Sequence, residues 1–377
     1  MTLPPPKTSL PHNVYWSDEA VPFKKIEHIA RGSFGSVDAV MRIPHIGQYY
    51  ARKTLSINRR RKEKTLAEIQ SEISVASSLE HFHVVKLVGT YSCGLEFSII
   101  MQPVADGNLD EFLRDHSNTR AYMCSQTIIR WIGCLTQGIA YLHGKGIIHR
   151  HIKPQNILQI GDRVILTDFG LSEEFKERTL IGTNVHCTRN YWPPESKVPI
   201  RPGKKDDIFS LGTVFLELLA LHSGVPLQIV WNKRPYSENL FEVHELIRIL
   251  SSTQPVELYS YWRQVMLYIT GNMLARISDY RPFADALAAC WEFPHHLAFP
   301  HTRCHCIADA MPPVGERCRG ILDASKEDSR RSKYWLARDC MRMRGTLQAC
   351  TEKAERILIR EMLNAPSLDS GSEVSTP

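Results

Sequence analysis

One short stretch, Ile147 to Leu158, constrains this chain more than any other part of its sequence. Apolar pairs bound the stretch at both ends, and its interior carries the polar residues His149, Arg150, His151, Lys153 and Asn156. Asp168 follows twelve positions after Asn156. Because short apolar strands are expected to flank Asn156 and Asp168, the pattern predicts a loop of reactive side chains held between buried segments.

The composition places the chain among ordinary globular proteins. It has 377 residues, of which 43% are apolar and 23% charged. That length suggests two or three domains, or one two-lobed domain with extensions. The net charge of +6 permits acidic partners but does not demand them. Ten scattered cysteines fit reduced thiols in the cytoplasm or the nucleus better than a disulfide framework.

The sequence carries no sign of a membrane or nucleic-acid partner. The first residues lack a basic region followed by an apolar run, so no signal peptide is expected. The longest apolar stretch, 211–221, is interrupted by Glu217 and is too short to span a bilayer. Basic residues do not alternate with aromatic ones as nucleic-acid-binding surfaces require. We therefore expect a soluble intracellular protein, cytoplasmic or nuclear.

Periodicity predicts a mainly β part followed by a mainly helical one. Alternating apolar residues predict strands within 23–55, 84–91 and 97–101, whereas spacings of three and four predict helices at 65–79, 128–142 and 207–221. We expect loops and one short helix in 222–262, and a helix from residue 282 to about 291. The expected organisation is a tail (1–22), a two-lobed domain (lobes 23–102 and 103–293), a Pro/His/Cys-rich segment (294–332), a helical extension (333–363) and a disordered tail (364–377).

Further motifs surround the central loop in a fixed order. Ile29 to Val37 carries glycines where backbone amides could approach a phosphate closely. Ala51-Arg52-Lys53 follows, then Met101 to Leu109 between the two parts, and Thr167-Asp168-Phe169-Gly170 after the loop. Taken alone, glycines between two strands more often form an ordinary β-hairpin. A lysine and a glutamate, taken alone, most often lie on a solvent-exposed surface. Chance agreement of all of them, in order, is improbable.

Together these motifs resemble those of the eukaryotic-type protein kinases, over about residues 23–293. Lys153-Pro154-Gln155-Asn156 is similar to the Ser/Thr-specific version of the catalytic loop. The resemblance implies an α+β fold of two lobes: a small, mainly β N-lobe and a larger, mainly α C-lobe, followed here by a C-terminal helical extension. It also implies ATP and Mg²⁺ as cofactors and a protein substrate or signalling partner.

The resemblance assigns roles to individual positions. Lys53 would pair with the α- and β-phosphates and with a glutamate, Glu72 or else Glu68. Asn156 and Asp168 would hold Mg²⁺, and His151, Lys153 and Asn156 would form the catalytic group. The implied nucleotide-binding residues are Ala30, Gly32, Gly35, Val37, Ala51, Lys53, Glu72, Met101, Gln102, Val104, Leu158 and Asp168.

His151 departs from the family pattern, which has Asp at that position to accept the substrate hydroxyl proton. Ala30 for a glycine, Cys187 before Thr188, and Pro193 for an alanine are further departures. Two hypotheses follow. The chain is a Ser/Thr kinase with weakened activity, or it is a pseudokinase that binds nucleotide and acts as a scaffold or allosteric partner.

Other family features have counterparts here. Glu195 would pair with Arg281. Arg150 would pair with a phosphate on Thr179 or Thr183, of which Thr183 is favoured by its position, and the alternative that both are unmodified surface threonines is given equal weight. Histidines and cysteines between 295 and 318 invite a zinc site, but their spacing lacks a second paired set, so ordinary loop residues are favoured.

Overall fold

The computed structural model describes residues 11–32, 35–44, 47–56, 69, 73, 76–117, 125–168, 189–197, 203–252 and 260–288. The chain divides into two compact units, Met1–Ala324 and Ser325–Pro377, and every described residue lies in the first. The predicted segments 294–332, 333–363 and 364–377, with the histidine and cysteine cluster, therefore lie outside the described residues.

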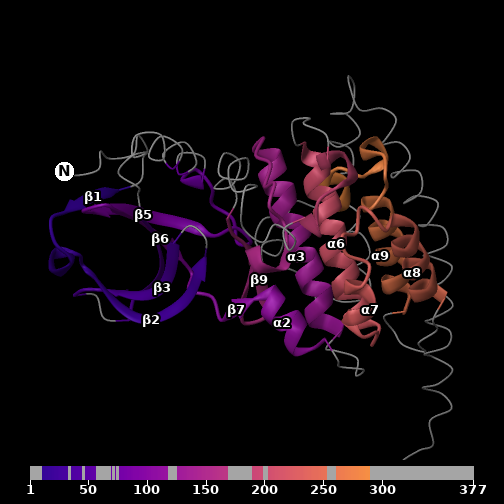
Figure 1. The fold of residues 1–377 in the computed structure, drawn as a ribbon, viewed down its shortest axis with the longest axis horizontal. Helices are drawn as coiled ribbons and strands as arrows, with labels where there is room; N and C mark the ends of the chain where they lie inside the picture. The colour runs from indigo at the N-terminus through magenta and orange to yellow at the C-terminus, as the bar shows by residue number, and fades with distance from the viewer. Residues whose placement is uncertain are drawn as a thin grey trace, which may run out of the picture. The chain divides into compact units, whose positions relative to one another are not determined.

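A six-stranded sheet forms the amino-terminal part (Figure 1). Its spatial order is β1-β5-β6-β4-β3-β2, and every neighbouring pair is antiparallel except β1 with β5. The predicted mainly β lobe is confirmed. The strands are β1 (His12–Tyr15), β2 (Phe23–Gly32), β3 (Gly35–Arg42), β4 (Tyr49–Ser56), β5 (Lys86–Cys93) and β6 (Glu96–Gln102).

Strand β1 contradicts the prediction of a tail through residue 22. His12 to Tyr15 pair in parallel with Thr90 to Cys93 of β5, and a short 3₁₀ turn, η1 (Asp18–Ala20), leads into β2. Four residues are too few to show an alternating pattern, and their partner lies almost eighty positions away. The strand exists because β5 offers unpaired backbone groups, which no local pattern reveals.

The remainder is mainly helical, with a second sheet of three short strands in the order β7-β8-β9. The strands are β7 (Gly107–Asn108), β8 (Ile157–Ile160) and β9 (Arg163–Leu166). The helices are α2 (Leu109–Asp115), α3 (Ser125–Gly144), α6 (Lys204–His222), α7 (Leu227–Trp231), α8 (Leu240–Ser252) and α9 (Ser260–Met273), with 3₁₀ turns η3 (Pro154–Asn156), η4 (Pro194–Lys197) and η5 (Ser278–Tyr280).

Helix α6 is the centre of the helical part and packs against α3 and α9 (Figure 1). Every residue from 207 to 222 is buried, as expected for a helix that is apolar almost all round. On α3 the predicted apolar face, Trp131, Leu135, Ile139 and Leu142, is fully buried. The described residues of the predicted helix at 65–79 follow the same rule, since Ile69, Ile73, Ala76 and Leu79 are all buried.

The region 222–262 holds more helix than predicted. It contains α7, α8 and the beginning of α9 instead of loops and one short helix. Its prolines suggested breaks, but Pro226 caps the start of α7, where a missing amide proton does no harm. The helical pattern of α8 is present in the sequence, because Val243, Leu246, Ile247 and Leu250 are its buried residues.

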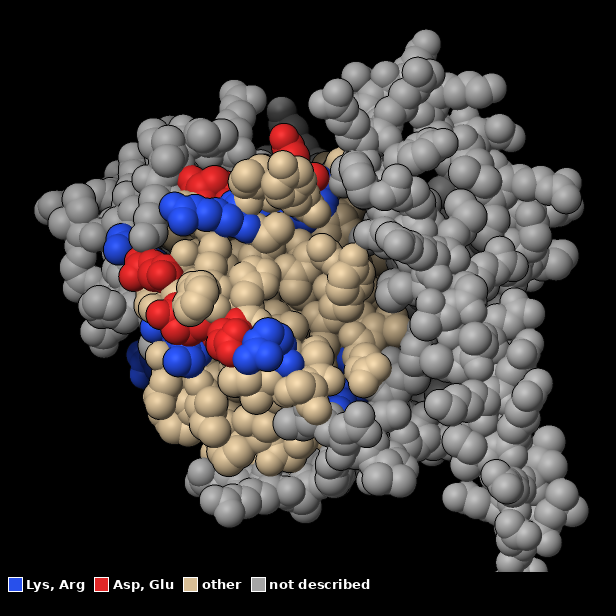
Figure 2. Space-filling view, turned by 90° about the vertical axis from the view of Figure 1, so that its right-hand side faces the viewer, with Lys and Arg blue, Asp and Glu red and all other residues tan. Residues whose placement is uncertain are grey.

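The surface is mixed in charge. On the face seen in Figure 2, Lys and Arg side chains lie next to Asp and Glu side chains around a broad area of other residues. Glu245 and Arg248 on α8 form an exposed ion pair. In the part of the chain that the structure describes, no helix has both the length and the apolar character needed to cross a bilayer.

Candidate functional site

The register of the large sheet brings five predicted site residues to one face. Residues directly opposite on antiparallel strands share a side of the sheet, and so do residues two apart on one strand. Ala51 lies opposite Met101. Lys53 lies opposite Val37, which in turn lies opposite Ala30. We call this side the inner face; the opposite side is the outer face.

The two predicted phosphate-loop glycines lie opposite each other where β2 meets β3. Gly35 has a φ of 151°, and a Cβ there would lie 1.9 Å from the carbonyl oxygen of Thr54 on β4. No side chain fits in that position. The packing of β3 on β4 therefore requires a glycine at position 35, whatever the loop binds. For Gly35 this steric requirement adds to the predicted approach of its amide to a phosphate, whereas for Gly32 only the predicted approach applies.

Lys53 and Asp168, which are 115 positions apart, meet in the folded chain. Lys53 Nζ donates to Asp168 Oδ1 at 2.6 Å. The lysine side chain is 15% exposed and the carboxylate 35%. Asp168 has a φ of 59°, an uncommon backbone conformation for a residue other than glycine. The β part and the helical part thus each contribute one member of this ion pair.

The charge state of Asp168 follows from its neighbours. Burial alone would raise the pKa of Asp168, but the charge and hydrogen bond of Lys53, with smaller contributions from His149 and Lys153, lower the pKa below its usual value. The carboxylate is therefore anionic at neutral pH, which is the state that a metal ligand needs.

Asp207, in the first turn of α6, holds the start of the central loop. Its two carboxylate oxygens accept the backbone amides of His149 and Arg150, each at 2.7 Å, and His143 Nε2 lies 2.9 Å from Oδ2. Arg150 has a φ of 65°, so this anchor fixes an uncommon backbone conformation. Sequence analysis placed Asp207 at the helix start but missed this role.

Asn156 holds the other end of the loop. Its Nδ2 donates to the carbonyl of His151 at 2.8 Å, and its backbone amide donates to the carbonyl of Lys153 at 2.9 Å. Its own carbonyl accepts from the amide of Thr167 at 3.1 Å, next to Asp168. The predicted catalytic group is therefore one hydrogen-bonded unit joined to the segment that carries Asp168.

The remaining predicted nucleotide contacts have different outcomes. Gln102 and Val104 are half-buried at and just after the end of β6. Leu158 lies on β8 opposite Ile165. Glu72 and its alternative Glu68 lie outside the described residues, as do Thr179, Thr183 and Cys187, so the predicted partner of Lys53 on the helix stays a prediction.

The predicted pair between Glu195 and Arg281 is confirmed. Arg281 donates to both carboxylate oxygens of Glu195, and its Nη2 lies 2.8 Å from Oε2. The guanidinium is fully buried, and its centre lies 4.9 Å from the centre of the Phe209 ring on α6. A paired, buried arginine of this kind fixes the segment around η4 to the helical part.

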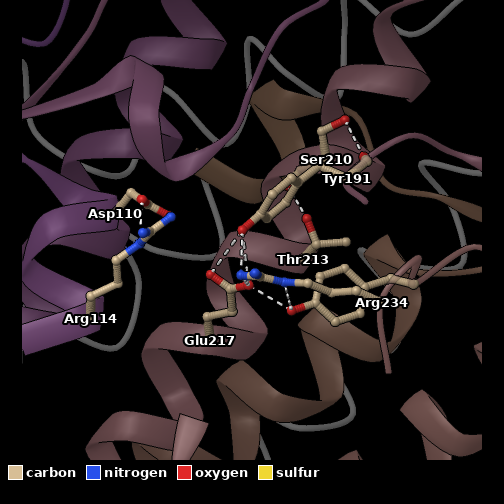
Figure 3. A network of polar contacts seen from close by, with 8 residues as sticks. Asp110, Arg114, Tyr191, Ser210, Thr213, Glu217 and Arg234 are labelled. Carbon is tan, nitrogen blue, oxygen red and sulfur yellow. Dashed lines mark hydrogen bonds and ion pairs between the residues drawn. The ribbon is translucent and has the colours of Figure 1, made fainter. Parts of the chain in front are cut away.

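A second anchor of this segment was missed. Figure 3 shows Tyr191 and Arg234 pointing toward Glu217 of α6. Arg234 Nη2 donates to Glu217 Oε1 at 2.5 Å, and Tyr236 and Tyr191 donate to the same oxygen at 2.5 and 3.1 Å. Burial, followed by the charge of Glu217, raises the pKa of Tyr191, so its hydroxyl stays a donor. Glu217 itself is the sequence feature that could have predicted this anchor, since a carboxylate inside an apolar run needs buried partners.

Comparison with known proteins identifies the family. A family model described as protein kinase domain matches residues 23–291. A relative from Caenorhabditis elegans, serine/threonine-protein kinase nekl-2, is 31% identical over 166 residues, which are 42% of this chain and 46% of the relative. Serine/threonine-protein kinase 4 homolog B from Dictyostelium discoideum is 28% identical over 316 residues, which are 83% of this chain and 27% of the relative.

The chain belongs to the protein kinase family, because the match covers well over half of it. Both of these relatives are named as serine/threonine-protein kinases. Protein kinases as a family use ATP and Mg²⁺. The chain spans less than half the length of each of these two relatives.

Proposed function

We propose that this chain binds Mg²⁺ and ATP at the site around Lys53 and Asp168 and transfers the γ-phosphoryl group to Ser or Thr of a protein, at a rate lowered by His151. One observation carries the proposal: the 2.6 Å contact between Lys53 Nζ and Asp168 Oδ1. Phosphoryl transfer depends mainly on positioning the phosphates and neutralising their charge. The contact joins a cation suited to the phosphates and a carboxylate suited to the metal.

The donor set fits magnesium. Asp168 supplies carboxylate oxygens, and Asn156 supplies an amide oxygen because its Nδ2 already donates to the carbonyl of His151. Mg²⁺ prefers oxygen ligands, and it keeps several waters besides one or two protein groups. Bound there, the metal would neutralise the charge of the phosphates. Asn156 and Asp168 would hold it, and Lys53 would turn from Asp168 toward the α- and β-phosphates.

His151 determines the expected rate. Its backbone amide donates to His149 Nδ1 at 3.3 Å and its carbonyl accepts from Asn156, so the main chain at this position is fixed from both sides. A neutral imidazole can accept a proton but brings no negative charge. General-base catalysis contributes about 10²–10⁴-fold, whereas electrostatic positioning contributes the larger share. The expected result is slow transfer.

His151 also favours a second function, that of a pseudokinase. Loss of the catalytic carboxylate with retention of Lys53, Asn156 and Asp168 is what a nucleotide-binding pseudokinase needs. In that case the chain acts on a signalling partner as a scaffold or allosteric protein, and ATP binding sets its conformation.

A transfer assay with γ-labelled ATP and a general Ser/Thr protein substrate separates the two functions. We expect the wild-type rate to lie on the order of 10²-fold below that of His151→Asp, and Asp168→Asn to be inactive. Equal rates for the wild type and His151→Asp would contradict the role given to His151. ATP binding without transfer by the wild type would establish the scaffold function.

A further inference from the structure

Strand β1 precedes the region that the chain shares with its family, since the family match begins at residue 23. The edge of β5 that receives it is shaped for a close approach. The amide of Thr90 donates to the carbonyl of Pro11 at 3.0 Å. A Cβ at Gly89 would lie 3.2 Å from the same oxygen, which is tighter than most real contacts. A glycine therefore lets the amino-terminal segment lie against β5.

His12 of β1 has a built environment at this edge. Its Nδ1 lies 2.8 Å from the hydroxyl of Thr90, and its Nε2 lies 3.3 Å from the hydroxyl of Ser92. The ring stacks on Phe97 with centroids 5.6 Å apart and planes at 17°. All three partners are almost completely buried. Because a hydroxyl can donate or accept, this arrangement satisfies both nitrogens of a neutral imidazole, and burial lowers the pKa of His12.

The partners of His12 on β5 are connected to Lys53 on β4 through the intervening strand β6. Thr90 lies directly opposite Ile99 of β6, and Ile99 lies directly opposite Lys53 of β4. Ser92 reaches β4 in the same way, through Phe97. These pairs all lie on the inner face, where side chains on directly opposite positions touch. Three cross-strand contacts, His12 with Thr90, Thr90 with Ile99 and Ile99 with Lys53, thus join the imidazole to the lysine.

The same segment also holds the outer face. Tyr15 of β1 meets the ring of Tyr91 edge-on at 5.5 Å, and Phe23, which follows the segment at the start of β2, stacks on that ring at 6.0 Å. The hydroxyl of Tyr91 accepts from Arg52 Nη1 at 3.2 Å. Arg52 is the residue next to Lys53, so β4 is held from both of its faces.

We propose that residues 11–22 act as an intramolecular clasp that positions Lys53 for the phosphates of a nucleoside triphosphate. His12 is a positioning residue: it acts through Thr90, Ile99 and the strand β4, and it does not touch the ligand. This inference rests on the proposed function, because it gives Lys53 the task of binding phosphates. It adds an amino-terminal element, outside the family match, that sets how well the lysine performs that task.

The test compares two ligands that differ in the phosphates. Calorimetric titration of the full chain with Mg²⁺ and ATP, and separately with adenosine, is carried out for the wild type, His12→Ala and Trp16→Ala. Trp16 lies in the same segment but is 83% exposed, which makes it the matched control. We expect His12→Ala to weaken ATP binding roughly fivefold or more and to leave adenosine binding unchanged. Trp16→Ala should change neither.

Thr90→Val supplies a second variant, since it keeps the shape of the buried side chain and removes only the hydroxyl that faces His12. It should weaken ATP binding in the same direction and by less. Equal losses of affinity for ATP and for adenosine would overturn the clasp. The same holds if either variant, His12→Ala or Thr90→Val, binds ATP as tightly as the wild type.

Hydrogen exchange without ligand separates failure of the clasp from failure of the proposed function. A wild type that binds neither ligand refutes the proposed function, and the clasp is then judged on exchange alone. We expect faster exchange in β4 and β5 for His12→Ala but not for Trp16→Ala. Unchanged exchange in β4 would refute the clasp independently of any nucleotide.

Discussion

Each face of the six-stranded sheet has basic side chains paired with a carboxylate: the outer face with Asp38 of β3, and the inner face with Asp168, which follows β9. On the outer face, Asp38 is 5% exposed and pairs with Lys25, Arg52 and His28, all within fourteen positions. On the inner face, Asp168 is 35% exposed, lies in an uncommon backbone conformation and pairs with a lysine 115 positions away.

The difference distinguishes a structural cluster from a candidate ligand site. Asp38 has used its hydrogen-bonding capacity on three partners, and removing it would leave their charges facing one another. Asp168 has one ion-pair partner among the described contacts, and its side chain is 35% exposed. A carboxylate that is open to solvent and held in an uncommon conformation can exchange its partner for a ligand, whereas a buried and satisfied one cannot. The cost of removing a carboxylate should therefore follow its burial.

The largest effect on stability is expected for Glu217, whose side chain is completely buried. Glu217→Gln leaves Arg234 without its countercharge and should lower the free energy of unfolding by about 3 kcal/mol in urea titrations. The control is Glu245→Gln on α8, where the partner Arg248 is exposed, and it should cause no measurable change. Equal effects of the two substitutions on the free energy of unfolding would contradict the rule that burial determines the cost of removing a carboxylate.

A smaller effect is expected for Asp38. Asp38→Asn removes the anion that holds Lys25, His28 and Arg52, and it should lower the free energy of unfolding by about 1–2 kcal/mol at pH 7. Two of these partners, Lys25 and His28, are about half exposed, which limits the loss of stability. A chemical-denaturation curve that coincides with the wild type would show that the outer cluster is not structural.

Acid should weaken the same cluster. Burial alone would raise the pKa of Asp38, but hydrogen bonds from Lys25, His28 and Arg52 lower it from 3.8 to about 2. A pKa that is lower in the folded state gives stability that is present above pH 4 and lost as pH falls toward 2. Wild type should lose this contribution between pH 4 and 2, and Asp38→Asn should lack that part of the pH dependence. Parallel pH profiles would contradict the assignment.

The smallest effect on stability is expected for Asp168. Asp168→Asn should change the free energy of unfolding by less than about 1 kcal/mol, because its carboxylate is partly solvated and pairs with one lysine. A loss larger than that of Asp38→Asn would reverse the comparison and would make the inner pair a structural one.

The sequence predicted the features that a strong local or ordered pattern specifies. The buried faces of α3 and of the helix around Ile73 follow their apolar spacing. The family resemblance that the motifs carry predicted both the two-lobed fold and the pair of Glu195 with Arg281. The meeting of Lys53 with Asp168 followed from the family resemblance, since no local pattern joins positions so far apart.

The features that sequence analysis missed depend on distant partners. Strand β1 forms only because β5 has a free edge, and the roles of Asp207 and Glu217 depend on groups that reach them from other elements. The helices of 222–262 were missed for another reason: Pro226 lies at the start of α7 and Pro235 lies in a turn before α8, and proline at such positions does not interrupt a helix.

The central claim is that Lys53 and Asp168 form a site for a metal-bound triphosphate, and calorimetric titration with ATP in the presence and absence of Mg²⁺ tests it most directly. The wild type and Glu245→Gln should bind ATP in a Mg²⁺-dependent way with the same affinity, and Asp168→Asn should bind at least about tenfold more weakly. A wild type that binds no ATP, or an Asp168→Asn variant that binds it as tightly as the wild type, would contradict the claim.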